Sequence, residues 1–255
     1  IFGFAAILVT IATIIISFIS VSYEGFERRS YDLRYRWKPT QEPIEDIVII
    51  KIDEKSLQKL GRFYNWPRVY HAKVIDYVNE GGALCVGLDL FFPERDESPD
   101  PAIDLFVKTY GVDPELARYI LKRYSFDSLL AETFAKWGNI VLAYHFTEEK
   151  TKSYIPDWLG YKADVKFTPP KLNYQGIVLP VEPLLSKSAR VGFVNPVPDP
   201  DGVVRGMPLI VPYQDKWLAS FGMEIVLGLL GKSLRDIEFG ANYVKILNKK
   251  LPIYD

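Results

Sequence analysis

The stretch NWPRVYHAKVIDYVNEGGALCVGLDLFFPE, residues 65–94, decides the fold class of this chain. Residues 68–79 place apolar side chains at helical spacing, and the pair Gly81-Gly82 follows as a stop signal. The apolar run 83–92 then has the composition of a strand that is buried on both faces. A helix followed at once by a buried strand predicts a βαβ unit in a parallel sheet.

Similar runs on either side extend this pattern. Residues 47–52 are rich in β-branched side chains and predict a first buried strand, whereas residues 127–136 predict a helix and residues 139–146 a third strand. The order strand, helix, strand, helix, strand indicates an α/β fold with a parallel-rich central sheet and flanking helices. Between them, residues 96–125 form an excursion with a helical stretch of its own at 114–124.

The first 23 residues carry no charge. As a helix they would be about 34 Å long, enough to cross a bilayer core of about 30 Å. A signal peptide is the alternative, but its apolar core is usually about 7–15 residues long. We therefore expect a transmembrane helix at 1–23, a juxtamembrane helix at 24–38 that ends before Pro39, and a globular domain at 39–255 that is incomplete at its C-terminus.

The charge and cysteine content exclude several classes of function. The chain has 255 residues and a formal net charge of -1, which argues against nucleic-acid binding. Its single cysteine, Cys85, cannot form an intrachain disulfide or a thiolate metal site. The glycine-rich nucleotide-binding, serine hydrolase and zinc protease motifs are also missing, so the sequence gives no signature of catalysis and names no cofactor.

Polar residues follow or end three of the predicted strands: Asp53, Asp89 and His145. Ligands of open α/β sheets bind beyond the carboxyl ends of the strands. Two carboxylates and an imidazole at that edge could hold a divalent metal or a cationic ligand. The alternative is structural, because each carboxylate could cap the next helix or turn.

Arg68 and His71 lie on one side at the start of a predicted helix, which Trp66 and Pro67 introduce. Arg68 could bind the anion of a ligand, or it could form a structural salt bridge with Asp53 or Asp89.

The segment Asp199-Pro200-Asp201-Gly202 resembles the beginning of a calcium-binding loop. The glutamate expected at the twelfth position is Ile210 here, so the full motif is missing. We expect a tight turn within a C-terminal β-hairpin, with Arg205 bound to Asp199 or Asp201.

In this order, the blocks YDLRYRW, IVIIKIDEKSLQKLG, residues 65–94, DSLLAETFAKWGNIVLA and GFVNPVPDPDGVVRGMPL resemble the CHASE2 sensory domains. The similarity covers most of residues 31–231. It implies a domain outside the cytoplasm of a bacterial transmembrane receptor, whose output is a nucleotide cyclase or a kinase. The matching positions are Asp53, Trp66, Pro67, Arg68, Asp89, Asp199, Asp201, Gly202 and Arg205.

Two features depart from the family. The excursion at 96–125 is longer than the usual link, and basic residues follow the membrane helix, where the positive-inside rule would favour the cytoplasm. We expect a membrane-bound, homodimeric input domain for an unidentified small molecule, ion or protein. A metal-dependent hydrolase that uses Asp53, Asp89 and His145 is the second hypothesis, and a dimerisation scaffold without ligand is the third.

Overall fold

The structure is a computed structural model and describes residues 9–11, 13, 23, 25–39, 42, 44–96, 101–123, 126–151, 155–162, 174–240 and 242–252. The chain divides into two compact units, Ile1–Asp53 and Glu54–Asp255. The transmembrane helix expected at 1–23 lies mostly outside the described residues. Within the described part of the chain, no helix has both the length and the apolar character needed to span a membrane.

The first unit contains the juxtamembrane helix, described over residues 25–36. The Trp37 N–H continues its hydrogen-bond pattern by donating to the Leu33 carbonyl at 3.1 Å. Residues 47–52, in contrast, form no strand and are exposed, and Ile49 is 86% exposed. The predicted buried strand is therefore wrong here, because β-branched residues favour a strand only where a neighbouring strand supplies a ladder.

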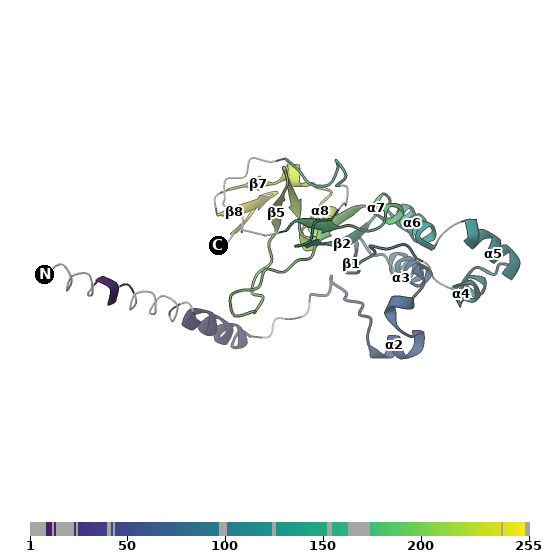
Figure 1. Ribbon diagram of the computed structural model, residues 1–255, viewed down its shortest axis with the longest axis horizontal. Helices are drawn as coiled ribbons and strands as arrows, with labels where there is room; N and C mark the ends of the chain where they lie inside the picture. The colour runs from purple at the N-terminus through teal and green to yellow at the C-terminus, as the bar shows by residue number, and fades with distance from the viewer. Residues whose placement is uncertain are drawn as a thin grey trace. The chain divides into compact units, whose positions relative to one another are not determined.

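The second unit is built around strand β2 (Ile140–Thr147), which Figure 1 shows near the centre of its sheet. Strand β2 pairs in parallel with β1 (Val86–Leu88) and with β4 (Arg190–Phe193). It pairs in antiparallel with β3 (Gly176–Val178). The fold is thus mixed α/β, with parallel pairing at the centre and an antiparallel strand that the sequence did not predict.

Helices cover both faces of β2. Helices α3 (Arg68–Glu80) and α6 (Phe126–Trp137) lie side by side and share a buried cluster with Leu142 and Tyr144 of the strand. On the other face, α8 (Phe221–Leu229) approaches so closely that a Cβ on Gly192 would lie 2.5 Å from the Cα of Phe221. Because strand side chains alternate between faces, β2 is buried on both sides, as its apolar composition predicted.

The remaining elements complete this unit. The excursion holds two helices where the sequence predicted one, and helix α8 begins two residues after the end of strand β6. The elements not yet given are α2 (Glu54–Leu60), η1 (Phe63–Asn65), α4 (Pro101–Tyr110), α5 (Pro114–Arg123), α7 (Glu182–Leu185), β5 (Ile210–Tyr213), β6 (Lys216–Ala219), η2 (Leu234–Asp236), β7 (Glu238–Phe239), β8 (Tyr243–Ile246) and β9 (Lys249–Pro252).

The C-terminal hairpin differs from the prediction. The Asp-Pro-Asp-Gly segment does form a turn, in which the Gly202 N–H donates to the Asp199 carbonyl at 2.8 Å and Gly202 has φ of 80°. The strands before and after it, β4 and β5, are not paired with each other. The hairpin joins β5 to β6 instead, and β7, β8 and β9 form a separate antiparallel sheet.

Candidate functional site

Arg68 ties together three segments that are distant in the sequence. Its Nε donates to Oδ1 of Asp127 at 3.2 Å, and its Nη2 donates to the carbonyl of Glu94 at 3.0 Å. Its guanidinium also lies 4.5 Å from the ring centroid of Phe92. The structural alternative for Arg68 is therefore the one observed, but the partner is Asp127 rather than the predicted Asp53 or Asp89.

Asp96 and Asp127 complete this arrangement, which we call the Arg68 bracket. The Asp96 carboxylate accepts a hydrogen bond from the Arg68 backbone N–H at 2.9 Å, which caps α3 where Pro67 offers no polar side chain. The Asp127 carboxylate accepts one from the Asp96 N–H at 2.9 Å. The bracket thus fixes the loop after β1 to the first turns of α3 and α6.

Sequence reasoning missed Asp127, although it is fully buried. An acidic residue in the first turn of a helix is common, because it interacts favourably with the helix dipole, so nothing local marked it. An acidic residue within an otherwise apolar helical face was the available signal.

His71 lies inside an aromatic cage. Its ring centroid is 5.8 Å from that of Phe63, 6.5 Å from that of Trp66 and 5.5 Å from that of Phe92. Burial, with a smaller contribution from the Arg68 charge, lowers the pKa of His71 to about 4. His71 is therefore neutral at physiological pH.

Asp89 and His145 lie at the carboxyl-end edge of the sheet, as predicted. Asp89 directly follows β1 and is exposed. His145 lies in the last part of β2, and its ring packs edge-on against Phe91 at a centroid distance of 4.7 Å. Burial lowers its pKa, and its Nδ1 is buried with no hydrogen-bond partner among the residues described.

The third member of the predicted triad, Asp53, ends the first unit and is half-buried. The described part of the chain holds no group of three or more histidine, cysteine or acidic side chains able to bind a metal ion. The alternative hypothesis of a metal held by these three residues therefore has no support among the described residues.

Asn195 closes the same edge of the sheet. Its Oδ1 accepts from the Phe146 N–H at 2.7 Å, and its Nδ2 donates to the Phe146 carbonyl at 2.9 Å. The side chain thus continues the ladder on β2 beyond the end of β4. The sequence analysis did not single out Asn195, although it lies in the GFVNPV block before a proline.

The Asp-Pro-Asp-Gly turn is held by Arg205, as predicted. The guanidinium forms ion pairs of 2.6 Å with Asp199 and 2.8 Å with Asp201. Both carboxylates are therefore already engaged by the one Arg205 guanidinium within the loop. The turn and its ion pairs account for the Asp-Pro-Asp-Gly pattern without a bound calcium ion.

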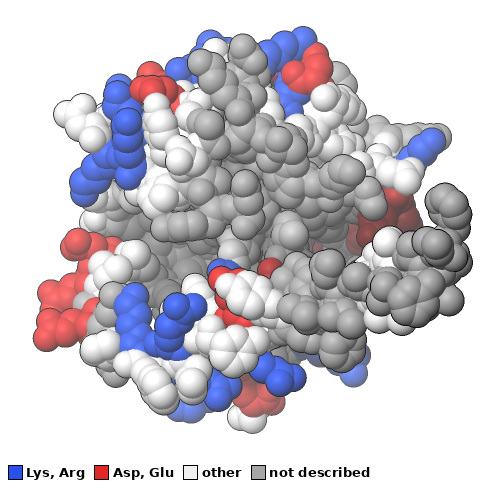
Figure 2. Space-filling view, turned by 90° about the vertical axis from the view of Figure 1, so that its left-hand side faces the viewer, with Lys and Arg blue, Asp and Glu red and all other residues white. Residues whose placement is uncertain are grey.

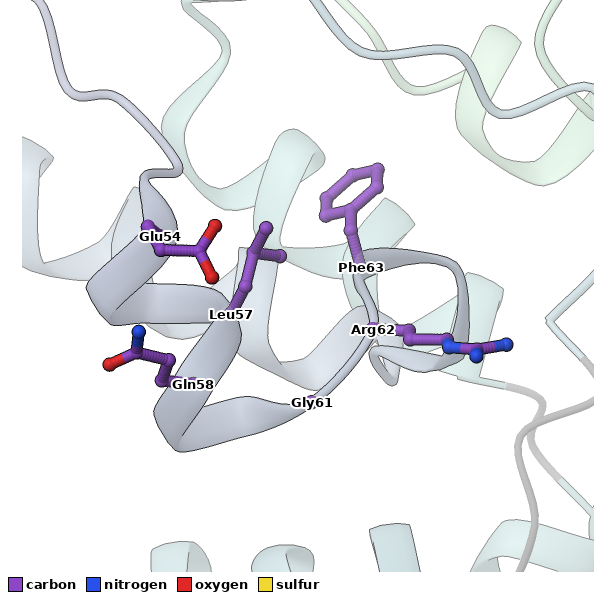
Figure 3. Close-up of a pocket in the computed structure, with 6 residues that line it drawn as sticks. All are labelled: Glu54, Leu57, Gln58, Gly61, Arg62 and Phe63. Atoms are coloured by element: carbon purple, nitrogen blue, oxygen red, sulfur yellow. The ribbon is translucent and has the colours of Figure 1, made fainter.

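A shallow depression of about 440 Å³ lies between α2 and η1. Figure 3 shows Leu57 and Phe63 directed to the same side, whereas Arg62 extends away from it. Phe63 also contacts Trp66 at a centroid distance of 5.4 Å, so the depression adjoins the cage of His71. Figure 2 shows acidic and basic groups interspersed over the face it displays, in keeping with the near-zero net charge.

The Arg68 bracket predicts a specific pattern of stability. Replacing Arg68 by leucine leaves the Asp127 charge buried without its partner, and we expect a loss of about 3–5 kcal/mol in the free energy of unfolding. Adding Asp127→Asn removes that charge and should restore part of the loss. Urea denaturation of the two variants measures this. If the double variant were no more stable than Arg68→Leu, the unpaired Asp127 charge would not be the cause of the loss.

The lowered pKa of His71 predicts how stability depends on pH. The histidine binds a proton below about pH 6.5 in the unfolded chain but only below about pH 4 in the folded one. Stability is therefore full above pH 6.5 and falls as the pH drops towards 4, by about 3 kcal/mol in total. His71→Phe keeps a ring in the cage and should remove this component. Equal pH profiles of unfolding free energy for the two proteins would contradict the assignment.

Comparison with known proteins identifies one family. The family model described as the CHASE2 domain matches residues 6–254. No curated protein and no solved structure matches the chain. CHASE2 domains are sensory domains that lie outside the cytoplasm in membrane receptors. The match covers nearly the whole sequence and includes the Arg68 bracket, the strand-end edge and the Arg205 turn. This chain therefore belongs to the CHASE2 family of extracytoplasmic sensory domains.

Proposed function

We propose that this chain is the input domain of a membrane-bound signalling receptor and relays a stimulus through membrane helices to a cytoplasmic nucleotide cyclase or kinase. The observation that carries the proposal is the family match over residues 6–254. A sensory domain is not catalytic, which is consistent with a non-enzymatic segment.

The sheet edge that carries Asp89 and His145 is the part of this domain best suited to receive a stimulus. Asp89 is exposed, and the buried Nδ1 of His145 has unused hydrogen-bonding capacity. Such a group gains a hydrogen bond when a ligand supplies a partner. Arg68, in contrast, is engaged within the protein by Asp127 and Glu94, and Arg205 by two aspartates.

The proposed mechanism is a shift between two populations. A small molecule, ion or protein that binds one arrangement of the domain more tightly favours that arrangement. The helix of residues 25–36 is the proposed transmitter, and a homodimer is the proposed assembly. The hydrolase and scaffold hypotheses gain no support from a specific observation.

Asp89→Asn tests the sensing role. Because Asp89 is exposed, we expect the free energy of unfolding to change by less than about 0.5 kcal/mol. The cyclase or kinase output of the full-length receptor in native membranes should nevertheless change severalfold. Glu80→Gln, an equal loss of charge at another exposed position, is the matched control. Equal output from the wild type and both variants would remove Asp89 from the sensing site.

A topology experiment tests the location. Alkaline phosphatase, which is active only outside the cytoplasm, is fused after residue 255, with any later membrane helices left out. We expect an active fusion, and an inactive one when residues 1–23 are deleted. An active β-galactosidase fused at the same residue would place the domain in the cytoplasm, as the basic residues after the predicted span would favour, and would refute the proposal.

A further inference from the structure

The juxtamembrane helix carries a narrow apolar stripe. Phe26, Leu33 and Trp37 lie on one face because they are seven and four residues apart, about two turns and one turn. Their exposed fractions are 71%, 46% and 75%, so the described residues of the first unit leave the stripe exposed. Tyr31 and Tyr35 lie on the opposite face, where their rings stack at 6.5 Å.

Arginines border this stripe on both sides. At about 100° per residue, Arg29 and Arg36 lie about 60–80° from Phe26 on one side, and Arg34 lies about 80° from it on the other. Residues 25–38 hold five basic and two acidic side chains, a net charge of +3. The stripe is therefore an apolar surface with cationic edges.

The charges distinguish between two possible occupants. The spacing of positions 26, 30, 33 and 37 also suits the seam of a parallel coiled coil with a second copy. In that pairing, Arg29 of each helix would face Arg34 of the other helix. The dimer would therefore contain two repulsive arginine–arginine contacts. An anionic surface, in contrast, attracts all three flanking arginines at once.

We propose that this helix lies against a bilayer surface that contains anionic phospholipids. Aromatic side chains favour the boundary between headgroups and acyl chains, and arginines there bind lipid phosphates. Gly25, which has no heavy atom within 4 Å of where a Cβ would be, gives the helix a weak point just before the stripe. The inference rests on the proposed function only in requiring the chain to be at a membrane.

Site-directed spin labelling of the full chain tests the inference, since the single Cys85 is easily replaced by alanine. Nitroxide labels are placed one at a time at positions 11 and 26–37, and the protein is reconstituted in vesicles of phosphatidylcholine with phosphatidylglycerol or of phosphatidylcholine alone. Collisions with oxygen, relative to those with a water-soluble nickel complex, report depth. We expect a period of about 3.6 residues with maxima at 26, 33 and 37 in the anionic vesicles, and at least twofold smaller amplitude in the neutral ones.

Two double variants locate the electrostatic contribution. The first double variant combines Arg29→Gln with Arg36→Gln, at two positions that border the stripe. It should reduce the amplitude of the depth period at least twofold. Arg28→Gln with Lys38→Gln removes the same charge from outside the borders and should reduce it less. Equal reductions would contradict an oriented surface contact.

The remaining outcomes separate this inference from the proposed function. A label at position 11 in lipid, with labels 26–37 in water or with a steady gradient, would overturn the surface contact and leave the membrane anchor intact. Spin–spin broadening at 26, 33 and 37 would assign the stripe to a second copy and also overturn it. A label at position 11 in water would overturn both.

Discussion

Every strand of the main sheet depends on strand β2. Strands β1, β3 and β4 each pair with it, and α8 packs directly over it. Its side chains alternate between the cluster shared with α3 and α6 and the face under α8, so both faces are buried. The close contact with α8 requires Gly192, where any Cβ would meet the helix backbone. Strand order, helix placement and the position of the strand-end edge all follow from this one element.

The polar groups of the second unit fall into two classes with different physical roles. The Arg68 bracket and the Arg205 turn are closed networks, in which each charged side chain already has its partner. Arg190 and Glu224 form a similar pair between β4 and α8 at 2.9 Å. Burial raises the pKa of Glu224, and the Arg190 charge opposes that rise. In the Arg68–Asp127 and Arg190–Glu224 pairs, removing one partner would leave a costly buried charge, whereas the carboxylates of the Arg205 turn are more exposed.

The second class is found at the carboxyl-end edge of the sheet, where Asp89 and His145 lie. Its polar groups are not all engaged within the protein. This edge combines the accessible carboxylate of Asp89 with an imidazole atom of His145 that has no partner among the described residues, and the Asn195 side chain is hydrogen-bonded to Phe146 beside them. We propose this edge as the place that receives the stimulus, because the buried Nδ1 of His145 has unused hydrogen-bonding capacity there. The juxtamembrane helix belongs to the other unit, and we propose that its apolar stripe and arginines contact the membrane surface.

Local sequence patterns determined the helices α3, α5 and α6, the strand β2, the Asp-Pro-Asp-Gly turn with Arg205, and the family. The helices and the turn depend on neighbours within a few residues, so spacing and turn chemistry suffice for them, strand β2 was marked by its continuous apolar run, and the family by the ordered blocks over residues 31–231. Tertiary structure alone decided that Arg68 binds Asp127, 59 residues away, that β5 pairs with β6, and that residues 47–52 form no strand. Ion pairs and strand ladders require a partner that distant parts of the chain bring into position, and residue spacing does not reveal which partner that is.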